Sequence, residues 1–233
     1  NYFHSFYAFD ANTGYRFFVM ERMDSTISSV VPLLLKNKPS SKTINIGPIC
    51  VKLLECLRAV HETKKIIRDV KTENFMLTLA SEASGSSLEA KLASRIRLID
   101  LAMATQWNRM YYEVDTGDMI GTPLYASLNL HSGKKTSFRD DLESLGYVIA
   151  ELLTQLYSGD PSKQLPWSKG KSDEDIGSIK ELLVDDPDSE FYLQLGNAKT
   201  IAVFSEYMEI VRGYSFKTIP DYDELSEILS KLT

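Results

Sequence analysis

Apolar residues follow two different spacings along this chain, and each spacing predicts a different kind of element. Residues 15–23 are rich in aromatic and β-branched side chains, which is typical of a strand, and residues 10–14 contain the Asn and Gly of a turn. We therefore expect a β-hairpin at the start. From Thr43 to His61 apolar side chains recur every three or four residues, which predicts an amphipathic helix.

The middle of the chain predicts two short strands joined by a loop. Residues 74–79 and 95–99 have the apolar or alternating pattern of strands, whereas residues 80–94 between them are rich in Ser, Ala and Glu. Because such a low-complexity segment offers little to a core, we expect residues 80–94 to be an exposed, mobile insertion.

After Arg139 the pattern is helical to the end of the chain. Leu142, Leu145 and Ile149 lie on one apolar face, and Asp221 is a suitable N-cap for the last helix. Further helices are predicted at 173–184, 198–212 and 221–232. The whole pattern predicts an α+β fold with a few strands first and a mainly α-helical remainder.

The composition is that of a globular domain, with 233 residues of which 43% are hydrophobic and 25% charged. A net charge of -6 argues against a general nucleic-acid binder, and no apolar run approaches the ~18 residues of a membrane span. Cys50 and Cys56 lie on one predicted helix, too far apart for a disulfide. Two reduced thiols predict a cytoplasmic or nuclear protein.

A charged run, Ile67-Arg-Asp-Val-Lys-Thr-Glu-Asn74, lies between the predicted helix and the next strand. An aspartate followed five positions later by an asparagine is the spacing of a protein-kinase catalytic loop. Asp69 can meet a substrate hydroxyl, Lys71 can neutralise a transferred phosphoryl group, and Asn74 can face a metal ion. Taken alone, the run is also compatible with a solvated turn.

Asp100 stands at the end of the second predicted strand, in the sequence Leu98-Ile-Asp-Leu-Ala-Met-Ala104. Kinases place their main Mg²⁺ ligand at such a strand end, usually in the triplet Asp-Phe-Gly. The triplet here is Asp-Leu-Ala, and an acid after a strand is also compatible with a helix cap.

The segments 121–131 and 137–147 are the most specific features of the chain. They read Gly-Thr-Pro-Leu-Tyr-Ala-Ser-Leu-Asn-Leu-His and Ser-Phe-Arg-Asp-Asp-Leu-Glu-Ser-Leu-Gly-Tyr. These segments closely resemble the casein kinase I family and, somewhat less, the vaccinia-related kinases, and like that family the chain lacks the Ala-Pro-Glu of most kinases. The resemblance covers nearly the whole chain from about Phe17.

The resemblance implies a protein-kinase-like fold of the α+β class. Residues 1–24 would form the end of the small lobe and the hinge, and residues 25–233 the large C-terminal lobe. In the hinge, Met20 would be the gatekeeper, and the backbone from Glu21 to Met23 would bind the adenine of ATP.

The resemblance also implies a protein serine/threonine kinase that uses ATP and Mg²⁺ and acts on protein substrates, acidic ones among them. Asp69 and Lys71 would serve catalysis. Thr122 would bond this pair and favour Ser or Thr over Tyr as the acceptor. Asn74 and Asp100 would bind the metal, with side-chain oxygens converging near one point.

Further residues have supporting roles or two open interpretations. By resemblance, Asp141 would hold the backbone of the catalytic loop, and we expect His61 and His131 to be structural. A basic group is compatible either with a solvated face or with a patch that reads phosphate on substrates: Lys134, Lys135 and Arg139.

The chain departs from the family pattern at five positions in these motifs, one of which is Leu101 in place of the phenylalanine of the metal triplet. Ile67 replaces a histidine, Thr72 a proline, Ala102 a glycine and Phe138 an arginine that holds anions. If the fold required positive φ at position 102, its Cβ would be strained.

The 233 residues also contain no Gly-x-Gly-x-x-Gly loop and no Val-Ala-x-Lys strand before residue 20. Two interpretations follow: a fragment of a longer kinase, or a family member without that lobe. We expect the isolated chain to be inactive, because nothing in it would hold the triphosphate, and we expect a longer parent to be active. The alternative function is a pseudokinase that binds partners without turnover.

Overall fold

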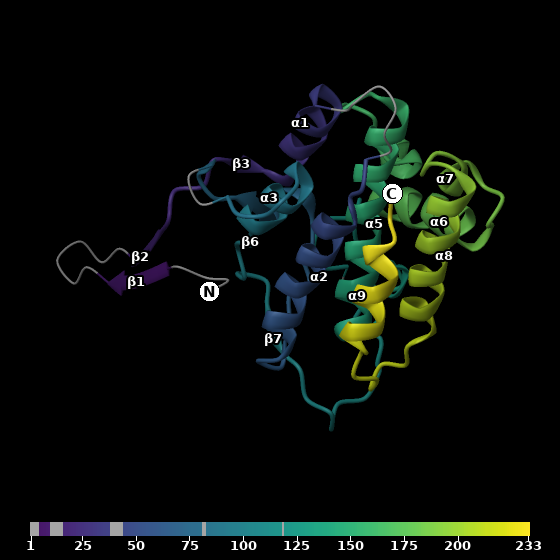
Figure 1. The fold of residues 1–233 in the computed structure, drawn as a ribbon. Coiled ribbons are helices and arrows are strands. Elements are labelled where there is room, and N and C mark those ends of the chain that lie inside the picture. Colours follow the sequence, from purple (N-terminus) through teal and green to yellow (C-terminus); the bar gives the residue numbers. More distant parts are fainter. Residues whose placement is uncertain (1–4, 10–15, 38–43, 81–82, 118) are drawn as a thin grey trace.

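The computed structural model describes residues 5–9, 16–37, 44–80, 83–117 and 119–233 (Figure 1). The strands are β1 (Ser5–Phe9), β2 (Arg16–Met20), β3 (Ser25–Thr26), β4 (Lys65–Ile66), β5 (Phe75–Leu77), β6 (Ile96–Leu98) and β7 (Thr105–Gln106). The helices are α1 (Val30–Lys36), α2 (Gly47–His61), α3 (Leu88–Arg95), α4 (Leu128–His131), α5 (Phe138–Ser158), α6 (Asp173–Asp185), α7 (Glu190–Leu193), α8 (Ala198–Gly213) and α9 (Tyr222–Ser230). The α+β fold class predicted from the sequence is confirmed.

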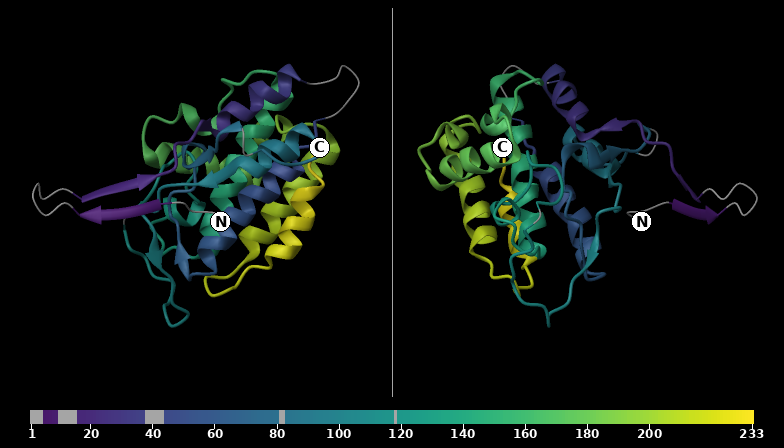
Figure 2. Two further views of the ribbon diagram at one scale, coloured as in Figure 1. Left: turned by 60° about the vertical axis from the view of Figure 1, so that its left-hand side comes forward. Right: turned by 180° about the vertical axis from the view of Figure 1, so that it is seen from behind.

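The predicted N-terminal hairpin is present. β1 pairs with β2 in antiparallel register, with Ser5 opposite Met20, while the predicted turn at residues 10–14 lies outside the described residues. Figures 1 and 2 show this hairpin projecting away from the helices, so the chain joins the helical body only at β3.

The core forms where α2 packs against α3, α5 and α9, and where α5 packs against α8. α5 is buried along most of its length because it lies inside the bundle of helices (Figure 2). Its start is fixed by a capping box in which Ser137 and Asp140 each satisfy the other's backbone N–H. The first residue of the predicted helix at 43–61 is outside the described residues, and α2 itself begins at Gly47.

A small antiparallel sheet, in the order β3-β5-β6, packs against α2 through β6 and contributes buried side chains to the same core. Phe75 pairs with Leu98, and both side chains are buried. This pairing confirms the two strands predicted at 74–79 and 95–99. The helices predicted at 173–184, 198–212 and 221–232 are also confirmed as α6, α8 and α9, and Asp221 caps α9 by accepting from the N–H groups of Asp223 and Glu224.

The prediction for residues 80–94 was wrong. Residues 88–95 form α3, which Ser87 caps by accepting from the N–H of Ala90. Leu92 is 3% exposed and belongs to the main core, and Leu88 packs against that core. An apolar pair four residues apart on a short helix therefore outweighs the low-complexity composition of the segment.

Leu92→Ala is expected to lower the free energy of unfolding by about 2–3 kcal/mol, near the lower end for buried leucines because a short helix can adjust. Leu79→Ala is the matched control, because Leu79 is 45% exposed and should change stability little. Urea unfolding followed by circular dichroism measures both. Equal effects for the two variants would contradict the packing of α3 against the core.

Cys50 and Cys56 on α2 are both free and buried, as the sequence predicted for reduced thiols. Within the described parts of the chain, no helix combines the length and hydrophobicity that a membrane span requires.

Candidate active site

Three of the predicted site residues meet at the loop that follows α2. The Lys71 ammonium donates to Asp69 Oδ2 at 2.6 Å, and the Thr122 hydroxyl donates to Asp69 Oδ1 at 2.7 Å. Lys71 Nζ also lies 3.3 Å from the Thr122 oxygen. The Asp69 carboxylate is thus held from both sides, by a cation from its own loop and by a hydroxyl from a segment 53 residues later.

Asn74 closes the same loop. Its side-chain Nδ2 donates to the Asp69 carbonyl at 2.9 Å, which orients the amide so that the carbonyl oxygen remains for another ligand. The Ile99 N–H donates to the Asn74 carbonyl at 2.8 Å, so Asp100 lies one residue beyond the backbone partner of Asn74. Convergence of the Asn74 and Asp100 oxygens on one metal stays a prediction.

Two residues of this region adopt left-handed backbone conformations: Arg68 at φ 68° and Asp100 at φ 58°. Aspartate tolerates that conformation better than most residues, and the Asp100 carboxylate accepts from the N–H of Ala102 at 3.0 Å. Ala102 is not among the described positive-φ residues, so the Cβ introduced there causes no backbone strain. Arg68 supports the segment by donating from Nε to the Met103 carbonyl at 2.7 Å.

The loop backbone is anchored by a buried acid at the start of α5. Asp141 accepts from the N–H of Ile67 at 2.6 Å and from the N–H of Arg68 at 2.8 Å. His61 Nε2 lies 2.8 Å from the same carboxylate, and His61 Nδ1 lies 2.6 Å from the Tyr222 hydroxyl. A carboxylate only accepts, so Nε2 carries a hydrogen, and α2, α5 and α9 all hold the loop. The Ile67 side chain, where the family has histidine, is buried in the core.

Gly121 brings the Thr122 segment against the loop. Its φ is +97°, and a Cβ at this position would come within 2.3 Å of the Arg68 carbonyl oxygen. Only glycine permits this approach, and the approach places Thr122 on Asp69.

Buried side-chain donors bind the backbone carbonyls of the residues after Thr122. The Trp167 indole N–H donates to the Leu124 carbonyl at 2.8 Å. Lys180 on α6 donates to the carbonyls of Pro123 at 2.9 Å and Ala126 at 2.7 Å. Burial lowers the pKa of Lys180 to about 7. Burial and the neighbouring Lys180 lower the pKa of His131 to about 4, so that this imidazole is neutral.

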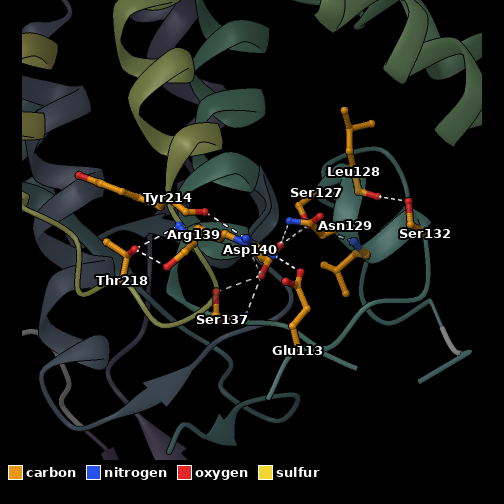
Figure 3. A network of polar contacts seen from close by, with 12 residues as sticks. Glu113, Ser127, Leu128, Asn129, Ser132, Ser137, Arg139, Asp140, Tyr214 and Thr218 are labelled. Carbon is orange, nitrogen blue, oxygen red and sulfur yellow. Dashed lines mark hydrogen bonds and ion pairs between the residues drawn. The ribbon is translucent and has the colours of Figure 1, made fainter. Parts of the chain in front are cut away.

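Arg139 belongs to a polar network at the start of α5 rather than to a solvated face (Figure 3). Its guanidinium donates to the Tyr214 carbonyl at 3.0 Å and forms an ion pair with Glu113. The neighbouring Asp140 accepts from the Ser127 hydroxyl at 2.8 Å and from the Asn129 amide at 3.1 Å. The network therefore ties α4 and the segment around residue 113 to α5.

The other basic residues of that group are only partly exposed. The Lys135 ammonium lies 3.8 Å from the centre of the Tyr111 ring. Together with Arg68 and Lys134 it lines a cleft that Tyr111, Thr116 and Ile120 also line.

The predicted adenine-binding residues lie apart from the loop in the chain. Met20 ends β2 and is 37% exposed, and residues 21–24 connect β2 to β3. Glu21 and Met23 belong to that connection. Their role in binding ATP stays a prediction.

Two residues of the site were not predicted from the sequence. The Tyr222 hydroxyl had no signal beyond its place next to the N-cap of α9. The sequence does carry a signal for the burial of Lys180, because this residue lies four positions after Ile176 and four before Val184, on the apolar face of its helix. A lysine on such a face is buried only where acceptors meet it.

In this loop an aspartate at the start of α5 binds the backbone, and a threonine that follows a glycine binds the loop aspartate. This arrangement is characteristic of the large lobe of a protein kinase. The protein kinase domain family matches residues 2–194, and the chain belongs to this family.

Within the family the chain is similar to casein kinase I homologues. It is 30% identical to casein kinase I homolog 3 of Saccharomyces cerevisiae over 78% of the chain and 36% of that protein. It is also 30% identical to casein kinase I homolog 3 of Schizosaccharomyces pombe, over 83% of the chain and 40% of that protein. A probable serine/threonine-protein kinase of fowlpox virus is 25% identical over 93% of the chain and 64% of its own length. The chain thus spans well under half the length of the two yeast relatives.

Proposed function

We propose that this protein is a serine/threonine kinase of the casein kinase I type, which transfers the γ-phosphoryl group of Mg-ATP to Ser or Thr hydroxyls of proteins. The observation that carries the proposal is the Asp69 carboxylate, held by Lys71 and Thr122 in a loop whose backbone is anchored on Asp141. Asp69 would orient the acceptor hydroxyl and take its proton as the O–P bond forms.

The donor set fits a magnesium ion. Mg²⁺ prefers carboxylate and amide oxygens, and Asn74 and Asp100 supply one of each near the end of β6. When bound, the ion would neutralise charge on the transferred phosphate. Lys71, which lies between Asp69 and Thr122, would add a positive charge on the side of the acceptor.

Acidic protein substrates are the proposed class. The cleft lined by Arg68, Lys134 and Lys135 opens beside the catalytic loop and would attract such chains. The proposed location is the cytoplasm or nucleus, in keeping with the two free buried cysteines.

A pseudokinase that binds partners without turnover is the second candidate. The replacements Ile67 and Asp-Leu-Ala at 100–102 favour it. The experiment below separates the two.

Asp69→Asn in the full-length protein is expected to reduce transfer of radiolabelled phosphate from ATP to casein by about 10²–10⁴-fold, because the group that positions and deprotonates the hydroxyl is lost. Asp188→Asn makes the same change at an exposed residue and should leave the rate unaltered. A wild-type protein no faster than Asp69→Asn would decide for the pseudokinase.

A further inference from the structure

Lys180 on α6 is a fully buried lysine, and its hydrogen bonds to backbone carbonyls are at Pro123 and Ala126 rather than at Asp69. Its side chain is 0% exposed, and its ammonium lies 4.6 Å from the centre of the Tyr147 ring and 5.4 Å from the centre of the Trp167 ring. A buried ammonium is retained only where its N–H groups find acceptors, because the desolvation of an unpaired charge costs several kcal/mol.

Two acceptors of Lys180 are backbone carbonyls, those of Pro123 and Ala126. His131 Nε2 lies 3.2 Å from the Lys180 nitrogen and 3.0 Å from the Pro123 carbonyl, and the tautomer of His131 decides which of the two it bonds. The two carbonyls belong to one short segment of chain, residues 123–126. Lys180 therefore bridges α6 to both ends of that segment.

The segment leads directly to the reacting groups. The N–H groups of Tyr125 and Ala126 both donate to the Thr122 carbonyl at 3.0 Å, which makes residues 122–126 one compact turn. The Thr122 hydroxyl in turn donates to Asp69. The backbone of residues 122–126 therefore connects the hydrogen bonds of Lys180 to the hydrogen bond between Thr122 and Asp69.

We propose that Lys180 is a positioning residue for phosphoryl transfer: its ammonium fixes the backbone of residues 123–126, and so sets where Thr122 and the acceptor segment of a protein substrate lie relative to Asp69. This inference rests on the proposed function. It assigns α6, whose hydrogen bonds among the described residues do not include the catalytic groups, a part in shaping the acceptor site.

Lys180→Met tests the inference, because methionine has similar length and suits the aromatic surroundings but offers no N–H donor. Hydrogen–deuterium exchange should show the amides of Tyr125 and Ala126 exchanging about tenfold faster or more, while those of α8 stay protected. Lys180→Arg, which keeps the charge and the donors, should restore part of the protection. Lys171→Met removes an exposed lysine next to α6 and should change nothing.

In the full-length kinase, Lys180→Met should lower kcat/KM for the protein substrate about tenfold or more while leaving KM for ATP unchanged. A loss confined to the protein substrate separates positioning from a general loss of structure. If Lys180→Met does not fold, Lys180→Arg set against the wild type gives the same two readouts.

Three outcomes would overturn the inference: unchanged exchange at residues 125 and 126, faster exchange spread evenly over all helices, or faster exchange with unaltered transfer. If the proposed function fails, the wild-type protein shows no phosphate transfer. Hydrogen–deuterium exchange of Lys180→Met would still show whether Lys180 protects the turn at residues 122–126.

Discussion

Asp141→Ala is expected to lower the free energy of unfolding by roughly 3–5 kcal/mol. The Asp141 carboxylate is 2% exposed and accepts from the backbone N–H groups of Ile67 and Arg68 and from His61. Alanine leaves all three donors buried without an acceptor, and each such donor costs about 1–3 kcal/mol. The loop at 67–74 should lose its backbone anchor at the same time, and the proposed phosphoryl transfer should be lost with it.

Urea denaturation of Asp141→Ala, Asp141→Asn and the control Asp173→Ala measures this effect. Asparagine keeps the shape and one acceptor oxygen, so Asp141→Asn should fall between the wild type and Asp141→Ala. Asp173 is an exposed acid in the first turn of α6, where its removal costs about 0.3–1 kcal/mol. A loss in Asp141→Ala no larger than in Asp173→Ala would show that the loop does not depend on this carboxylate.

Trp167→Ala is expected to cost about 4–5 kcal/mol, near the upper limit for a buried aromatic residue. Trp167 is 0% exposed, and its ring lies 5.3 Å from the ring of Tyr147 and 5.0 Å from that of Phe191. Alanine removes this packing and also leaves the Leu124 carbonyl without its indole donor. Thermal and urea unfolding report the loss.

A pair of tryptophan-to-phenylalanine variants separates the hydrogen bond from the packing. Trp167→Phe keeps most of the ring but removes the donor to Leu124. Trp107 is buried beside Phe138, and its indole N–H has no partner among the described residues, so Trp107→Phe removes no hydrogen bond. Trp167→Phe should therefore be the more destabilising by about 1 kcal/mol or more. Equal losses would mean that the hydrogen bond to Leu124 contributes nothing.

Sequence reasoning succeeded where a contiguous pattern determines the structure. The spacing of Asp69, Lys71 and Asn74 within one loop keeps them close in space. The amphipathic pattern at 43–61 correctly predicted α2, whose apolar side chains are buried. Thr122 could be placed beside them only through the resemblance to known kinases, because nothing local connects two segments that are far apart in the chain.

The failures have a common physical cause, which is that tertiary contacts decide what composition leaves open. Residues 80–94 look like a loop, yet Leu92 is drawn into the core and Arg95 is buried, donating to the Thr78 carbonyl. Lys180 lies on the apolar face of α6, but the carbonyls that accept its hydrogen bonds come from residues more than 50 positions earlier. Neither outcome can be obtained from local propensity.

The reactivity of the two free cysteines of α2 can report on the stability of the adjoining catalytic loop. Only the thiolate reacts with an alkylating reagent, and burial raises the pKa of Cys56 to about 11 and that of Cys50 well above its usual range. Iodoacetamide at neutral pH should therefore modify either thiol only in molecules where α2 has transiently opened. Because α2 ends at His61, which contacts Asp141, a nucleotide or substrate that tightens the loop should slow the reaction. The unmodified protein thus carries its own reporter of ligand binding, with no engineered probe.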